Sequence, residues 1–174
     1  MNKLLLITVA VLLLATVTAC APRLAINGNP EEVSSTASKI ADFDLPADYA
    51  PEFSASLAGY DVAAYSPGDG HSHLYLIQSE NETDSAKLEE MLAEMVPGSS
   101  DANTRMTVIE NRSASLRGES ATIVTSDGVD HEGGSYRQIT VAFQGKGGPA
   151  LLVLSEPTER WDQSTVDVLL ASIQ

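Results

Sequence analysis

The chain is poor in cysteine, aromatic residues and positive charge. Its 174 residues include a single cysteine, and aromatic side chains make up 5% of the sequence. One cysteine excludes an intrachain disulfide and a zinc site built from several thiolates. Lysine and arginine number 10 against 24 aspartate and glutamate residues, which gives a net charge of −14. We therefore expect no binding to nucleic acid, because its phosphate backbone repels so acidic a protein.

Long apolar runs are also scarce, and the one candidate opens the sequence. Residues 4–14 are apolar apart from Thr8 and follow one positive charge at Lys3. This run is shorter than the roughly 20 residues that a helix needs to cross the hydrocarbon core of a bilayer. A charged start, a short apolar stretch and a following small-residue region are typical of a secretory signal that is removed.

The only cysteine stands directly behind this run, in the tetrapeptide Val17-Thr18-Ala19-Cys20. The tetrapeptide resembles the bacterial lipobox, with an aliphatic residue three places before the cysteine and a small residue immediately before it. In that family the thiol is alkylated with a diacylglyceryl group, and cleavage leaves the acylated cysteine as the first residue. Alkylation needs a soft, ionisable nucleophile, which cysteine supplies.

The lipobox resemblance gives the chain an expected location. It implies a signal peptide over residues 1–19, lipidation of Cys20, and a protein exported to the cell envelope and held on a bacterial membrane by acyl chains. An ordinary signal that is cleaved near a free thiol is the alternative. Because the protein is acidic, we expect the lipid, and no basic surface, to make the membrane contact.

The rest of the chain divides into a linker and one domain. Residues 20–40 are rich in proline, asparagine and serine and show little periodicity, which predicts a flexible tether with at most a short helical turn near residues 31–38. A flexible chain of that length has an end-to-end distance of about 25 Å. Residues 41–174 are long enough for a single domain with its own core.

The domain is expected to be α+β. Apolar runs at 60–65 and 71–80 flank a Pro/Gly/Asp cluster, which predicts a β-hairpin. Helical spacing recurs at two places in the chain. The first stripe consists of Leu88, Met91, Leu92, Met95 and Val96, and the second of Val166, Leu169, Leu170 and Ile173. Asp162 is a suitable N-cap for the second helix.

Four further strands are predicted between the two helices, within residues 105–113, 115–126, 135–144 and 150–156. The third alternates apolar and polar residues, as a strand with one buried face does. The run Ala150–Leu154 has no polar face, so we expect it inside the sheet. The resulting fold is a mostly antiparallel sheet of about six strands with a mid-chain helix and a C-terminal helix.

This order of elements resembles the PsbP-like superfamily, which includes DcrB-like envelope lipoproteins. The similarity is carried by "DFDLPADY" at the start of the domain, "HLYLIQ" before the first helix, and "ERWD" followed by a helix ending in "LLASI". It covers roughly residues 43–174. The resemblance implies an α/β/α sandwich used mostly for binding and assembly, without a catalytic motif.

Three histidines are the main candidates for a metal site in the sequence. His71 and His73 are two residues apart, so on a strand both would point to one face, and His131 could supply a third ligand. The segment "HEGGS" begins like the zinc-protease helix but has Ser135 in place of the second histidine, and its two glycines disfavour a helix. Metal binding is therefore the weaker of two interpretations.

The catalytic motifs that the sequence partly matches are incomplete. "GESAT" lacks the second glycine of a nucleophile elbow, and "GKGG" lacks the Ser or Thr of a phosphate-binding loop. We expect no catalytic residue and no cofactor. The sequence favours a lipid-anchored, non-catalytic envelope protein that binds a protein partner or a small ligand. The alternative is a metal-binding protein or metal-dependent enzyme that uses the His71/His73 pair.

Overall fold

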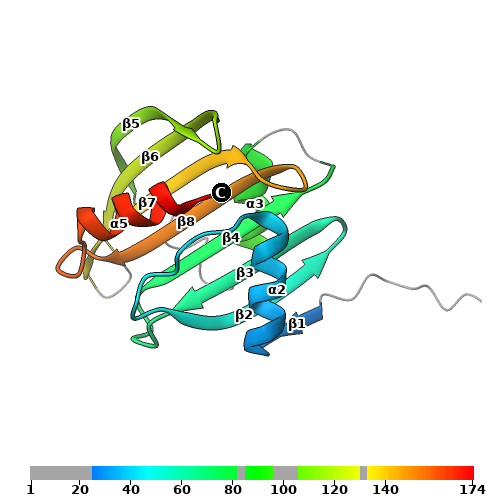
Figure 1. Cartoon of the computed structure of the whole chain (residues 1–174). Coiled ribbons are helices and arrows are strands. Elements are labelled where there is room, and N and C mark those ends of the chain that lie inside the picture. The colour runs from blue at the N-terminus through cyan, green and yellow to red at the C-terminus, as the bar shows by residue number, and fades with distance from the viewer. Residues whose placement is uncertain (1–24, 82–84, 96–105, 130–132) are drawn as a thin grey trace, which may run out of the picture.

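In the part of the chain that the structure describes, the fold is a single antiparallel sheet with three helices against it (Figure 1). A computed structural model of the chain describes residues 25–81, 85–95, 106–129 and 133–174. In chain order the elements are β1 (Ala25–Asn27), α2 (Pro30–Ile40), β2 (Ala50–Leu57), β3 (Tyr60–Ser66), β4 (His73–Ser79), α3 (Ser85–Met95), β5 (Thr107–Leu116), β6 (Glu119–Val129), β7 (Ser135–Gln144), β8 (Pro149–Pro157) and α5 (Gln163–Ser172).

The strands lie in the order β1-β2-β3-β4-β8-β7-β6-β5, and every neighbouring pair is antiparallel. Two of the hairpins close with two-residue turns in which both central residues have positive φ. These are Ala58-Gly59 between β2 and β3, and Arg117-Gly118 between β5 and β6. Such turns match the right-handed twist of the strands that they join. The β4–β8 pair connects the N-terminal and C-terminal halves of the sheet.

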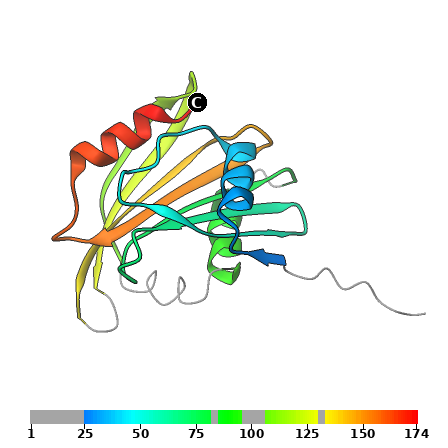
Figure 2. The ribbon, with the colours of Figure 1, turned by 60° about the horizontal axis from the view of Figure 1, so that its bottom comes forward.

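One face of the sheet is covered by α2 and α5 (Figure 2). The buried stripe of α2 comprises Val33, Ala37 and Ile40, and that of α5 ends in Leu169 and Leu170. These side chains share one hydrophobic cluster with apolar residues from β3 to β8. This cluster is the main core of the protein.

The other face carries α3, which packs on the central strands β4 and β8 (Figure 2). Leu88 of α3 is fully buried in a second cluster with Ile77 and Leu151, and Met91 packs against that cluster. Helices thus lie on both faces, but they are short and cover only part of each. The α+β class and the mostly antiparallel sheet are confirmed, whereas the α/β/α sandwich stays a prediction.

The expected number of strands was too low, because the described residues already form eight. Residues 50–57 form β2 although they contain Pro51, and a β-bulge between Pro51 and Phe53 accommodates the ring. Proline is tolerated in strands at such irregularities. The short β1 pairs with the outer side of β2. Neither strand has the strong apolar pattern that reveals the other six.

The flexible tether predicted over residues 20–40 is wrong from residue 25 onward. Residues 30–40 form a full helix whose apolar stripe is buried in the main core. Asn29 caps it by accepting a hydrogen bond from the Glu31 amide, and Pro30 occupies the first turn, where its missing N–H costs nothing. The described part of the fold therefore includes residues 25–40.

Other predictions of local structure are confirmed. The hairpin of β3 and β4 forms around the Pro/Gly/Asp turn, α3 spans the first predicted helix, and β8 lies inside the sheet. Asp162 is the N-cap of α5 and accepts from the Ser164 amide. The capping of α3 by residues 83–84 and its end at residues 97–98 lie outside the described residues. Within the described ranges, no helix has the length and apolar character that a membrane crossing requires.

Candidate functional site

A cluster of charged groups joins three segments at one end of the sheet. We call it the Glu156 cluster, and its members are Asp48, Tyr49, Asp69, Glu156 and Arg160. The phenol of Tyr49 donates a hydrogen bond to Oε1 of Glu156 at 2.7 Å. Arg160 donates to Asp48 at 2.6 Å and lies 3.5 Å from Asp69. The cluster ties the segment before β2 and the β3–β4 turn to the end of β8.

Burial and pairing shift the pKa values of this cluster in opposite directions. Burial raises the pKa of Glu156, whose exposed fraction is 9%, although the Tyr49 hydroxyl and Arg160 favour its charged form. Burial would also raise the pKa of Asp69. Hydrogen bonds from the His71 amide and from Ser72, together with Arg160, outweigh it and lower that pKa to about 2.

A second ion pair lies on the same face, next to the cluster in the sheet register. Arg137 of β7 is the cross-strand partner of Glu156. Its guanidinium donates two hydrogen bonds to Asp127, at 2.6 and 2.9 Å, and lies 5.7 Å from the ring centroid of Trp161. Arg137 lowers the pKa of Asp127. All of these groups have partners within the protein, so the arrangement is suited to holding segments together.

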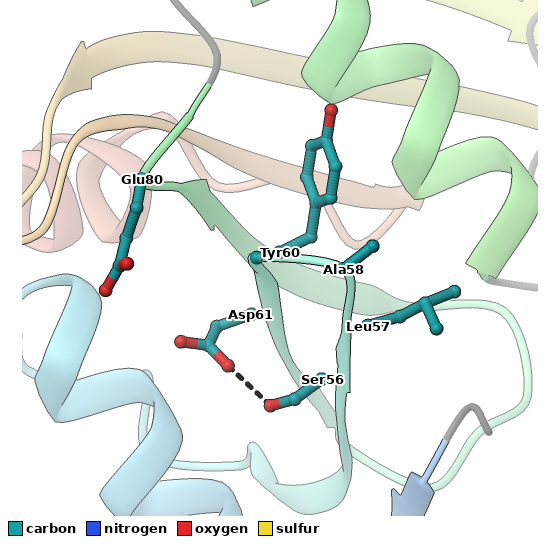
Figure 3. Close-up of a pocket in the computed structure, with 7 residues that line it drawn as sticks. Ser56, Leu57, Ala58, Tyr60, Asp61 and Glu80 are labelled. Atoms are coloured by element: carbon teal, nitrogen blue, oxygen red, sulfur yellow. Dashed lines mark hydrogen bonds between the residues drawn. The ribbon is translucent and has the colours of Figure 1, made fainter. Parts of the chain in front are cut away.

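A shallow pocket lies at the β2–β3 turn (Figure 3). Its lining comprises Ser56, Leu57, Ala58, Gly59, Tyr60, Asp61 and Glu80. Ser56 donates a hydrogen bond to Asp61, and Tyr60 points toward α3. The volume is about 330 Å³ and the pocket is open to solvent, so a small ligand would keep much of its surface in water. Two carboxylates give its rim a negative charge.

The histidine pair predicted from the sequence is not aligned by a strand. β4 begins at His73, so His71 lies in the preceding turn and strand alternation does not place both on one face. The His73 ring stacks on Tyr75, with centroids 5.6 Å apart, and its Nδ1 lies 3.4 Å from Glu52. His131 lies outside the described residues. Among the residues that are described, no three histidine, cysteine or acidic side chains gather as a metal site would require.

The predicted lipidation site, Cys20, also lies outside the described residues, as does the rest of the lipobox-like tetrapeptide. What the structure adds is the distance along the chain to the first described strand, since β1 starts at Ala25. Four residues, 21–24, lie between the predicted anchor and this strand.

The sequence did not single out β5 as a feature of interest. β5 is an edge strand of ten residues, and its first five residues are all exposed. Val108 and Ile109 have exposed fractions of 59% and 51%. The polar residues that follow these two positions in the sequence suggest a half-buried strand. Only the order of the described strands shows that none of them pairs with its outer side.

Comparisons with known proteins do not assign the chain to a family. No protein-family model and no curated protein matches it. Among solved structures, the chain is similar to one described as the crystal structure of LpqN involved in cell envelope biogenesis of Mycobacterium tuberculosis, at 13% identity. The match covers 90% of this chain and 86% of that one, with a TM-score of 0.40. A similarity at this level supports no statement about function, and the PsbP-like resemblance stays a prediction.

Proposed function

We propose that the chain is a lipid-anchored, non-catalytic protein of the bacterial cell envelope that binds or assembles with another envelope protein. The observation that carries this proposal is the lipobox-like Val17-Thr18-Ala19-Cys20, whose cysteine stands five positions before the first described strand. A binding role for the folded part is favoured over a reaction because its buried charged groups are satisfied by one another. The pocket at the β2–β3 turn is also too open to exclude water from a reaction.

A short link between lipid and sheet has a consequence for how the protein would sit. The five residue steps from Cys20 to Ala25 span at most about 18 Å when fully extended. The β1 edge would therefore stay near the headgroups. Eight strands spaced about 4.8 Å apart place the β5 edge about 34 Å across the sheet from the β1 edge. The acidic character of the protein opposes flat contact with anionic lipid, which favours a partner at the far edge.

The anchor is tested by the mass of the protein recovered from cells that export lipoproteins. We expect the mature wild-type chain to begin at Cys20 and to carry acyl mass, and Cys20→Ser to keep residues 1–19 without acyl mass. Thr18→Ala is the matched control, because it leaves intact both positions that define the motif, and it is expected to be processed like wild type. If wild type and Cys20→Ser are cleaved alike and neither carries lipid, the anchor is refuted.

The metal-binding alternative receives no comparable support from the described residues. His71 and His73 are not aligned by a strand, and His73 already contacts Glu52 and Tyr75.

A further inference from the structure

The two edges of the sheet differ in length. At one edge, β1 has three residues. At the other, β5 has ten, and among the residues that the structure describes no strand pairs with its outer side. Backbone N–H and C=O groups along such a side are free to pair with another strand, and proteins usually shorten or shield edges of this kind. The β5 edge is thus a surface suited to strand addition.

The sequence of β5 indicates what kind of strand fits. Glu110 and Arg112 flank Asn111 at the middle of the strand. Their partners on β6 are Thr125 and Ile123, and their side chains lie on one face with Arg112 Nε 3.6 Å from Glu110 Oε1. Both are partly exposed, at 39% and 55%. A partner strand that places an acid opposite Arg112 and a base opposite Glu110 would be complementary in charge.

We propose that the partner is a second copy of this chain, paired antiparallel through β5 with a twofold axis at Asn111. In that register Glu110 of each copy lies opposite Arg112 of the other, so four charges of alternating sign meet on one face. It is the only antiparallel register of β5 with itself that pairs these two residues directly. A twofold interface is self-complementary, so one strand supplies both halves of the match.

The interface is expected to be short. A register shift between Val108 and Glu110 interrupts the regular ladder of β5 near its start. The pairing therefore centres on residues 110–112 and gives a weak dimer in dilute solution. Attachment of both copies to one membrane, if the proposed anchor is present, raises their local concentration and favours pairing. The match between the two copies of β5 does not itself depend on that anchor.

Cysteine crosslinking of the full chain in cell membranes tests the register. Asn111→Cys places a thiol opposite its own copy, where paired residues have Cα atoms about 4.5–5.5 Å apart, a distance that a disulfide spans. Thr107→Cys is the matched control on the same edge, because its nearest copy lies roughly 27 Å away at a rise of about 3.4 Å per residue. We expect oxidation to give a disulfide dimer with Asn111→Cys and little with Thr107→Cys or wild type.

Charge exchange tests the ion pairs in the Asn111→Cys background. Glu110→Arg or Arg112→Glu alone turns two attractive pairs into repulsive ones, so we expect the dimer yield to fall about fivefold or more. The double exchange restores the pairs and should restore the yield. Glu159→Arg, an exposed position away from the edge with the same change in net charge as Glu110→Arg, should leave it unchanged.

Several outcomes would overturn the inference. These are equal crosslinking at positions 107 and 111, no dimer at position 111, no rescue by the double exchange, or crosslinking of Asn111→Cys to a different protein in place of its own copy. The mass of the same sample shows whether Cys20 carries lipid. The experiment therefore distinguishes a failure of β5 pairing from a failure of the proposed lipid anchor.

Discussion

At the scale of single residues, the most informative feature is a carboxyl group that the fold has largely removed from water. Glu156 is 9% exposed, and its hydrogen bond from Tyr49 spans 107 positions in the chain. Burial favours the protonated form of Glu156, while Arg160 and the Tyr49 phenol favour the charged form. Burial is the larger effect, so the pKa of Glu156 is higher in the folded protein than in the unfolded chain.

This shift predicts a pH dependence of stability. The ordinary pKa of Glu156 is 4.5, and the folded value is higher, so folding takes up a proton in the window that starts near pH 4.5. The contribution of Glu156 to stability is fully present below that window and is lost as the pH rises through the folded pKa. Glu156→Gln keeps an oxygen to accept from Tyr49 and does not titrate. We expect the variant to gain stability relative to wild type as the pH rises from 4 to 8.

Urea unfolding at several pH values measures the effect. The matched control is Glu159→Gln, which removes the same charge at an exposed position three residues further on. If Glu156→Gln and wild type give parallel curves of unfolding free energy against pH, Glu156 has the same pKa in both states and the argument fails.

At the scale of elements, two features of the α2 sequence point to different structures. Its composition indicates a linker, whereas the positions of its capping and apolar residues indicate a helix. The segment before residue 40 has serine, threonine and asparagine in numbers typical of a linker. It also has an N-cap at Asn29, acidic residues in its first turn, Lys39 in its last turn and an apolar stripe at helical spacing. The stripe is short, with Val33 and Ile40 as its large members. Packing against the sheet, which buries both completely, makes the helix stable.

If α2 is part of the core, removing one of its buried side chains must destabilise the whole protein. Ile40→Ala is expected to lower the free energy of unfolding by about 2–5 kcal/mol, the usual range for deletion of a buried aliphatic side chain. Ser35→Ala, on the exposed side of the same helix, should change it by less than about 0.5 kcal/mol. Chemical denaturation, followed through the spectroscopic signal of the sheet, measures the free energy of unfolding of both variants. Equal stability of the two variants would show that residues 30–40 are not part of the core and belong to the tether.

At the scale of the whole molecule, the sheet is stable at its centre and open at its far edge. β8 lies between β4 and β7, and residues 150–154 are buried on both faces, by α5 and the rest of the main core on one side and by α3 on the other. β5 has a neighbour on one side and a largely exposed surface. Local opening costs less where fewer apolar contacts are lost.

Hydrogen exchange of the dilute protein should therefore be graded across the sheet. We expect the amides of β8 and β4 to exchange slowest and about half of those of β5, the ones that point away from β6, to exchange fastest. Mass spectrometry of peptides from each strand measures the order. β3 has a neighbouring strand on each side but lies further from the centre of the sheet, so its amides should exchange at an intermediate rate. Protection of β5 equal to that of β8 at low concentration would contradict the gradient.

The sequence by itself determined the local structure wherever the apolar pattern was strong. The alternation in β7, the continuous run of Ala150–Leu154 and the stripe and cap of α5 each predict the element that forms, because each pattern allows one way to bury its apolar side. The lipobox-like tetrapeptide around Cys20 is likewise a property of the sequence alone, and it carries the proposed location.

Tertiary structure decided what no local pattern contains. Strand order made β5 an edge, and it brought Tyr49, Asp69 and Glu156 together from distant segments. It also drew α2 and β2 into the domain, since their weak patterns become favourable only when the sheet supplies the surface to pack against. The physical reason is that a side chain is buried only when a second segment packs against it, and the sequence of one segment does not specify which other segment that is.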